Sequence, residues 1–264
     1  MTVTQKLNVK VIGQGKQPML FAHGYGCDQK MWRYVTSAFE NDYQVILFDH
    51  IGFGKSDASG YTIGRYNSLE AYADDVLAII EELNLQDVIY VGHSVSAMIG
   101  VLASNKQPER FAKLVLISPS PCYVNDDNYI GGFTEENING LISSLESDYL
   151  TWAHTIAPVI MGNPDRPVLG QELADSFCSS NIEVAKDFAR ITFLSDNRHD
   201  LGNVTTDTLI LQCSEDVIAP EVVGEYVHEQ INGSQFVKME AVGHCPNLSA
   251  PEETITAIKN FLKR

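Results

Sequence analysis

The chain has 264 residues, 44% of them hydrophobic, and a formal net charge of −16 from 18 Lys and Arg against 34 Asp and Glu. This length suits one large α/β domain or a core with an inserted subdomain, and the acidic balance argues against a nucleic-acid partner, which needs a basic surface. No stretch resembles a signal peptide or the ~20 apolar residues of a membrane-spanning helix, and five scattered cysteines without a C-x-x-C pair favour reduced thiols. We therefore expect a cytoplasmic protein with no membrane partner.

The first half of the chain alternates predicted strands and helices. Asn67 and Glu70 stand at capping-box spacing before one helix, in which apolar residues recur at helical intervals. The continuous apolar runs of the strands predict a mostly parallel, twisted sheet with helices on both faces, the α/β class. The predicted strands are residues 7–13, 18–24, 43–50, 87–93 and 111–120, and the predicted helices are residues 31–40, 68–84 and 95–106.

This alternation stops between residues 121 and 197, where no strand is predicted. Residues 135–161 and 183–196 read as helices, and "GNPDRP" between them reads as a break. Strands then return at residues 207–216 and 235–243, with helices at 221–231 and 251–264. The sequence predicts an α/β core formed by residues 1–120 and 198–264, with a helical cap (lid) inserted at residues 121–197.

The segment "VIYVGHSVSAMIG", residues 88–100, reads as a strand, a sharp turn at Ser94 and a helix. It fits the nucleophile-elbow pattern G-x-S-x-G, except that Ser96 replaces the last glycine. Strand and helix are expected to approach closely at that position. Serine is small, and its hydroxyl can bond local backbone at a helix start. We therefore predict a working elbow with Ser94 as nucleophile, and a Ser96→Ala variant that keeps most activity.

A serine nucleophile needs a base and an acid that orients the base, and in this architecture the acid precedes the histidine in the chain. His244 in "AVGHCPNLS" lies in a loop after the last strand and is the predicted base. "LILQCSEDVIAP" offers Glu215 and Asp216 as the acid. The predicted oxyanion donors are the backbone N–H groups of Val95, after the nucleophile, and Tyr25 in "FAHGYGCDQ". No spacing indicates a metal site.

Together, "HGYG", "DHIGFGKSD", "GHSVSAMIG", "LQCSEDVIAP" and "GHCPNLS" resemble the α/β-hydrolase fold. More narrowly, the chain resembles the RsbQ group of bacterial stress-signalling hydrolases and the related karrikin and strigolactone receptors of plants. The resemblance implies a triad of Ser94, Asp216 and His244, no cofactor, and a V-shaped helical cap over an apolar pocket. The wall of this pocket would comprise Tyr25, His93, Tyr123, Phe133, Trp152, Ile156, Phe193 and Ile218. For the aromatic residues among them, the alternative role is packing within the cap.

The leading functional prediction is a serine hydrolase acting on a small apolar ester or lactone, and the resemblance implies an RsbQ-like stress-signalling role for it. One alternative is a receptor or regulator that hydrolyses its ligand slowly and recruits a partner protein through its cap; in RsbQ-like systems that partner would be a phosphatase. A further alternative is a cofactor-free perhydrolase, which would use the same triad. Fast multiple turnover would favour the enzyme, and a slow single-turnover burst would favour the receptor.

Overall fold

The computed structural model describes residues 1–263, which form a seven-stranded sheet and eleven α-helices. The order across the sheet is β1-β3-β2-β4-β5-β6-β7; β1 is antiparallel to β3, and the other neighbouring pairs are parallel. The predicted mostly parallel sheet is therefore confirmed. The strands are β1 (Lys10–Ile12), β2 (Gln17–Ala22), β3 (Tyr43–Leu47), β4 (Val88–His93), β5 (Phe111–Ile117), β6 (Asp207–Glu215) and β7 (Gln235–Val242).

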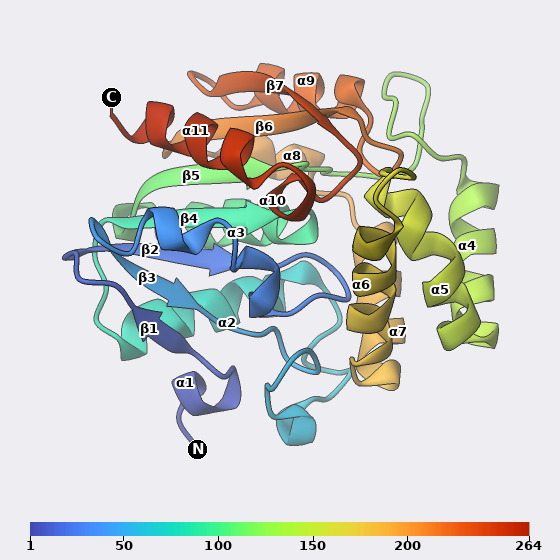
Figure 1. Cartoon of the computed structure of the whole chain (residues 1–264), viewed down its shortest axis with the longest axis horizontal. Helices are drawn as coiled ribbons and strands as arrows, with labels where there is room; N and C mark the ends of the chain where they lie inside the picture. The colour runs from blue at the N-terminus through green and yellow to red at the C-terminus, as the bar shows by residue number, and fades with distance from the viewer. Residues whose placement is uncertain (264) are drawn as a thin grey trace.

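Helices cover both faces of this sheet, with α11 in front and α2 and α3 behind it in Figure 1. α3 packs on α2, β4 and β5, while α9 and α11 pack on β6 and β7. The middle strands are consequently buried on both sides, which explains their continuous apolar sequences. The helices outside residues 118–197 are α1 (Val3–Lys6), α2 (Leu69–Glu82), α3 (Val95–Lys106), α8 (Arg198–Leu201), α9 (Glu221–Gln230), α10 (Pro246–Ser249) and α11 (Pro251–Leu262).

The remaining four helices lie together beyond the ends toward which the parallel strands point (Figure 1). They are α4 (Glu135–Ser147), α5 (Tyr149–Met161), α6 (Pro167–Cys178) and α7 (Ile182–Phe193). α5 packs on α4 and α6, and α4 also packs on α7. Residues 118–206 contain only isolated β-bridges and no strand of the sheet, as predicted for most of this segment.

The structure differs from the predictions for this segment in two details. Residues 135–161 form two helices, because the backbone of Asp148 is extended and ends α4. Asp148 is also the N-cap of α5, and its Oδ1 accepts the N–H of Thr151 in the first turn of that helix. The break predicted around "GNPDRP" is followed directly by α6, which the sequence analysis missed. Pro167 occupies the first turn of α6, where its lack of an N–H carries no penalty.

Elements near the N-terminus also differ from prediction. Residues 31–40 do not form a helix but belong to two short 3₁₀ turns, η1 (Gln29–Trp32) and η2 (Thr36–Ala38). The predicted capping box before α2 is absent, because Asn67 donates its amide to Gly64 O and Ser68 occupies the N-cap without a side-chain hydrogen bond. α1 was not predicted, although Thr2 and Gln5 form a capping box there.

Two chain-wide expectations can be compared with the described residues. All five cysteines are free thiols, as predicted. Among the helices formed by residues 1–263, none combines the length and the apolar character needed to cross a membrane.

Candidate active site

Ser94 lies at the sharp turn between β4 and α3, as predicted. Its φ of 57° and ψ of −125° are strained for a residue with a Cβ, and its N–H donates to Ile117 O over 2.9 Å. The close approach of strand and helix occurs at Gly92, where a Cβ would lie 2.4 Å from the carbonyl oxygen of Ser96. The close approach of strand and helix predicted at position 96 is therefore confirmed, and Gly92 is the residue that makes room for the backbone of Ser96.

The structure brings Ser94, His244 and Asp216 into one chain of hydrogen bonds. Ser94 Oγ is 2.7 Å from His244 Nε2, and His244 Nδ1 is 2.7 Å from Asp216 Oδ2. All three residues are buried. Glu215, the alternative acid, is exposed at the end of β6. A serine next to an imidazole that a carboxylate orients is the arrangement that activates a hydroxyl for attack.

The carboxyl of Asp216 is held in its charged form. Burial works to raise its pKa, but the nearby His244, its hydrogen bond and two backbone donors together keep the pKa below the usual value. The two backbone donors are the N–H groups of Ile218 and Ala219, which bond Asp216 Oδ1. An ionised Asp216 can only accept, so Nδ1 of His244 carries the hydrogen and Nε2 is left to accept the proton of Ser94.

The backbone around His244 is fixed from two directions. Its N–H donates to Ile160 O of α5 over 2.9 Å, and its carbonyl accepts from Nε2 of His93 over 2.7 Å. Nδ1 of His93 is buried without a hydrogen-bond partner, and burial lowers the pKa of His93 to about 3. His93 is therefore a neutral donor that supports the histidine loop, while α5 is tied directly to that loop.

The two predicted oxyanion donors, Tyr25 and Val95, flank Ser94. Val95 begins α3, and Tyr25 lies in the loop after β2. Within residues 1–263, neither backbone N–H has a protein acceptor. Gly24 allows the Tyr25 loop to approach the elbow, because a Cβ there would meet His93 Nδ1 at 2.6 Å and Ser94 Cβ at 3.2 Å. An oxyanion donor must be unused by the protein in this way, so the predicted roles of Tyr25 and Val95 are consistent with their contacts.

A small cavity of about 30 Å³ lies over Ser94. Five of the eight predicted wall residues line it: Tyr25, His93, Tyr123, Phe193 and Ile218. The other wall residues of the cavity are Cys27, Ser94, Ile160, Leu173, Phe177, Thr192, His244 and Cys245. Leu173 and Phe177 were missed because α6 was not predicted, and the cysteines were read only as buried thiols.

Three predicted wall residues do not line this cavity. Trp152 is stacked on Phe177 with ring centroids 5.8 Å apart and an interplanar angle of 14°. Ile156 borders an outer groove between α4 and α5. Phe133 is half-buried, and its backbone forms an isolated bridge with Val124. Trp152 therefore supports the wall from behind, which is the packing role that the sequence left open.

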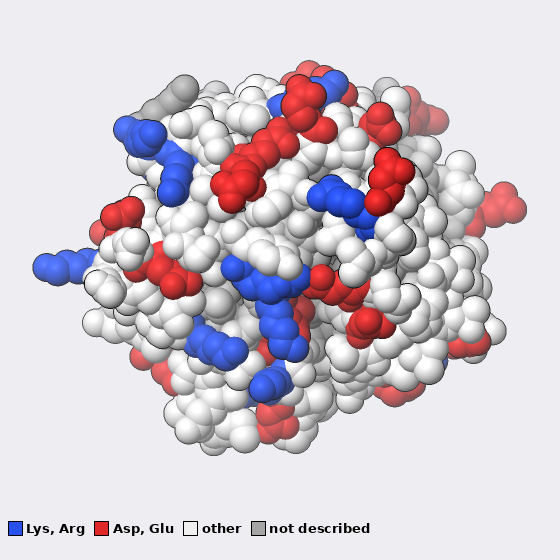
Figure 2. Space-filling model, in the orientation of Figure 1, with Lys and Arg blue, Asp and Glu red and all other residues white. Residues whose placement is uncertain are grey.

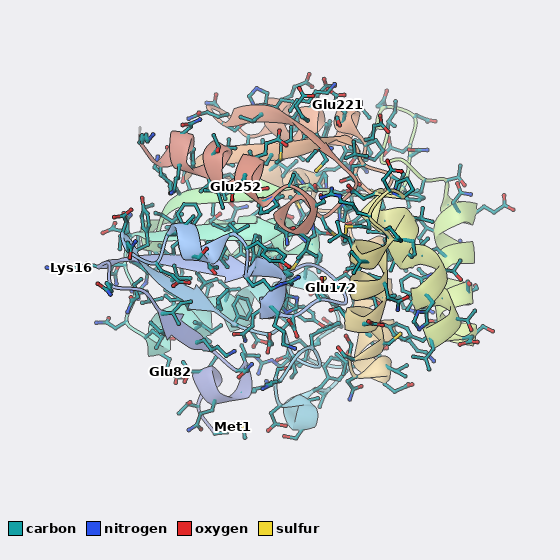
Figure 3. The ribbon with its side chains drawn as sticks, in the orientation of Figure 1. Met1, Lys16, Glu82, Glu172, Glu221 and Glu252 are labelled. Carbon is teal, nitrogen blue, oxygen red and sulfur yellow. The ribbon has the colours of Figure 1, made fainter. Side chains whose placement is uncertain are left out.

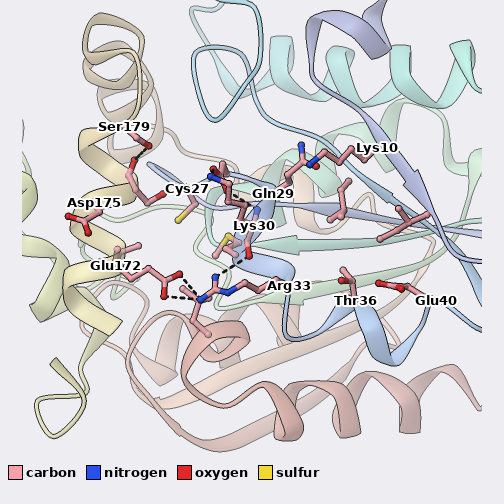
Figure 4. Close-up of a pocket in the computed structure, with 17 residues that line it drawn as sticks. Lys10, Cys27, Gln29, Lys30, Arg33, Thr36, Glu40, Glu172, Asp175 and Ser179 are labelled. Atoms are coloured by element: carbon pink, nitrogen blue, oxygen red, sulfur yellow. Dashed lines mark hydrogen bonds and ion pairs between the residues drawn. The ribbon is translucent and has the colours of Figure 1, made fainter. Parts of the chain in front are cut away.

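A larger cleft of about 690 Å³ lies between the η1 segment and α6 (Figure 4). Cys27 and Leu173 border both this outer cleft and the inner cavity, so these two side chains separate them. Arg33 forms an ion pair with Glu172 across the outer cleft (Figure 4). Glu172 belongs to α6 and is labelled in Figure 3. On this face of the molecule, basic side chains gather near the centre among acidic ones (Figure 2). Within residues 1–263, no group of three or more His, Cys, Asp and Glu side chains could hold a metal ion.

Comparison with known proteins assigns the chain to a family. The model of the alpha/beta hydrolase family matches residues 19–257. The chain is 39% identical to the karrikin insensitive 2 receptor CA of Petunia hybrida, covering 97% of this chain and 95% of that protein. It is 37% identical to a strigolactone esterase of Arabidopsis thaliana, covering 99% and 98%. A solved hydrolase from Oleispira antarctica is 38% identical with a TM-score of 0.96, covering 99% and 96%. As its motifs predicted, the chain belongs to the alpha/beta hydrolase family.

Proposed function

We propose that this hydrolase cleaves a small apolar ester or lactone with Ser94 as nucleophile, His244 as general base and Asp216 as the acid that orients His244. The observation that carries the proposal is the buried hydrogen-bond chain through these three residues, with 2.7 Å at each step. Glu215, which faces solvent, has no part in it.

In the proposed reaction, Ser94 Oγ attacks the carbonyl carbon while His244 Nε2 takes its proton. The N–H groups of Tyr25 and Val95 stabilise the oxyanion of the tetrahedral intermediate; loss of one such donor costs ~10²–10³ in rate in other enzymes. His244 then gives its proton to the departing alkoxide, leaving an acyl group on Ser94. A water molecule, deprotonated by His244, releases the acid and restores the serine.

The chemistry of the cavity supports a small apolar substrate. Aromatic and aliphatic side chains from Tyr25, Tyr123, Phe177, Phe193 and Ile218 dominate its wall. Its volume of about 30 Å³ is far below the ~300–1,000 Å³ of typical ligand pockets, so side chains of the wall must move when a substrate enters. Two relatives, the strigolactone esterase of Arabidopsis thaliana and a 3-oxoadipate enol-lactonase of Acinetobacter baylyi, have names that support an ester or lactone carbonyl as the reacting group.

We also propose that residues 121–197 act as the cap and that residues 1–120 and 198–264 form the catalytic core. The grouping of α4, α5, α6 and α7 beyond the strand ends supports this division. Residues from α5, α6 and α7, including Ile160, Phe177 and Phe193, line the cavity over Ser94 and leave it only about 30 Å³. Access to Ser94 then depends on movement of these helices or of their side chains.

The direct test is intact-protein mass spectrometry during exposure to a panel of p-nitrophenyl esters and small lactones. We expect multiple turnovers by the wild-type chain and a transient acyl adduct on Ser94, both absent in Ser94→Ala. Equal hydrolysis by the folded alanine variant would overturn the assignment of Ser94. Adding hydrogen peroxide and a carboxylic acid to the same assay tests the perhydrolase alternative, since that activity would form a peracid.

A receptor role is the second candidate, and the small volume of the cavity favours it. A ligand that enters must displace side chains of α5, α6 or α7, and the N–H of His244 bonds Ile160 O in α5, so occupancy of the site is linked to the cap. The names of the plant karrikin receptors point the same way. A phosphatase-type partner and an RsbQ-like stress-signalling role stay predictions. A single-turnover burst that changes the amide hydrogen exchange of α4–α7 would favour this role over rapid turnover.

A further inference from the structure

The hydroxyl of Ser96 makes long-range hydrogen bonds rather than the local helix-start bond expected from the sequence. Its Oγ–H donates to the carbonyl oxygen of His23 over 2.5 Å, and Nε2 of His50 lies 2.8 Å from the same Oγ. The side chain of Ser96 is fully buried. The residue that replaces the usual elbow glycine therefore connects α3 to two other strand ends.

These contacts form a closed set of hydrogen bonds whose directions can be assigned. Because the single hydroxyl hydrogen of Ser96 goes to a carbonyl, His50 Nε2 must donate to Oγ. The backbone N–H of His50 donates to His23 Nε2 over 3.0 Å, so His23 carries its hydrogen on Nδ1, which donates to Gly24 O over 2.9 Å. Burial lowers the pKa of both imidazoles, which keeps them neutral with one donor nitrogen each.

The set of bonds reaches the loop that carries the proposed oxyanion donor. His23 follows β2, Gly24 packs against the side chains of His93 and Ser94, and Tyr25 comes next. Ser96 lies two residues after the nucleophile on the first turn of α3. Its bond to His23 therefore joins the helix that presents Ser94 to the loop that presents the N–H of Tyr25.

We infer that Ser96 is a positioning residue that fixes the N–H of Tyr25 relative to Ser94 Oγ, and so sets the geometry of the oxyanion hole. The inference rests on the proposed function, because it concerns the same intermediate. A glycine at this position would leave the carbonyl of His23 and the Nε2–H of His50 buried without partners in this chain. This inference and the expectation from the sequence that Ser96→Ala keeps most activity make opposite predictions for that variant.

Kinetics of Ser96→Ala and Ser104→Ala with p-nitrophenyl acetate test this inference. Ser104 is the matched control, since its buried hydroxyl lies on the same helix but donates locally to Val101 O. We expect Ser96→Ala to lower kcat and kcat/KM together by roughly 10–100-fold, the loss typical of a small misplacement of catalytic groups. Labelling of Ser94 by a fluorophosphonate should slow in parallel, whereas Ser104→Ala should keep wild-type values in both assays.

Thermal melting and a Ser96→Cys variant keep this test decisive if Ser96→Ala loses stability. The thiol keeps a hydrogen at this position but is larger than the hydroxyl and a weak donor, so a folded Ser96→Cys chain should also have a lowered kcat with an unchanged KM. Wild-type kcat in a folded Ser96→Ala or Ser96→Cys chain would overturn the inference while the proposed function stands. An equal loss in Ser104→Ala would overturn it as well, because any buried hydroxyl of α3 would then matter. A wild-type chain without ester hydrolysis would overturn the proposed function itself, and this inference with it.

Discussion

The backbone at Ser94 occupies a conformation that glycine adopts more readily than any residue with a Cβ. Such strain costs about 1–3 kcal/mol, and glycine relieves it. Glycine also has more conformational freedom in the unfolded chain, which lowers stability by only ~0.5–1 kcal/mol relative to alanine. We therefore expect Ser94→Gly to have no hydrolase activity but a higher melting temperature than Ser94→Ala. Differential scanning calorimetry of the two variants decides this, and a glycine variant that melts first would contradict it.

The acid next to His244 can be tested against its own neighbour. Asp216→Asn should lower kcat by about 10⁴, as in another triad, because asparagine can no longer hold the correct tautomer of His244. Glu215→Gln removes the same charge one residue earlier, from an exposed side chain, and should leave kcat unchanged. Steady-state kinetics on the pair would reject the assignment if the two variants lost activity equally.

The order of the acid and the base could be predicted from the sequence, but the choice between Glu215 and Asp216 could not be made from the residues alone. β6 ends at Glu215, and the chain then turns so that Asp216 Oδ1 accepts the N–H groups of Ile218 and Ala219. This turn directs the carboxyl of Asp216 toward His244. The contacts of Ser96 were similarly hidden, because its partners lie 73 and 46 residues away in the chain.

Among the elements, α5 and α6 depend on each other through an aromatic stack. Trp152 is buried against Phe177 and behind Tyr25 rather than in the cavity. We expect Trp152→Ala to lower the free energy of unfolding by ~3–5 kcal/mol, as for other buried tryptophans, with little change in substrate preference at low temperature. Urea unfolding should show this loss.

Leu150→Ala is the control for that measurement. Leu150 lies on the same helix with 47% of its surface exposed, so its truncation should change stability little. A Trp152→Ala chain that unfolds like Leu150→Ala but has an altered preference among substrates would show that Trp152 contacts the substrate after all.

The strands could be predicted because burial on both faces gives them continuous apolar sequences, and Ser94, Tyr25 and His244 followed from their places at strand ends. The pocket wall was predicted less completely, because it depends on how the helices between residues 121 and 197 pack. Proline at residue 167 was read as a break, although proline is also common in the first turn of a helix. Recognition of that signal would have placed Leu173 and Phe177 on α6, though not over the cavity.

At the scale of the whole molecule, three buried neutral histidines make stability depend on pH. Burial lowers the pKa of His23, His50 and His93, in the last case to about 3. Between an unfolded pKa of about 6.5 and these folded values, the unfolded chain binds more protons than the folded chain. The free energy of unfolding should therefore fall as pH drops below about 6.5, by up to ~1.4 kcal/mol per pH unit for each histidine.

Urea unfolding at several pH values between 5 and 7 measures how steeply the free energy of unfolding changes with pH. His93→Gln should reduce this slope by the contribution of one histidine, up to ~1.4 kcal/mol per pH unit. The exposed His154 provides the control, because His154→Gln should leave the slope unchanged. An identical slope in the wild-type and His93→Gln chains would show that His93 gains its proton in the folded state as readily as in the unfolded state.

The small volume of the cavity over Ser94 has a consequence for how ligand affinity varies among related chains. A ligand larger than about 30 Å³ can enter only those molecules in which the wall is open at that moment. If about one molecule in a hundred is open, the measured Kd is about a hundredfold weaker than the Kd of the open form. Two chains with identical cavity linings can then differ in apparent affinity solely through the equilibrium between their open and closed forms. Substitutions in the packing of α5 against α6, remote from any ligand atom, would act as affinity mutations.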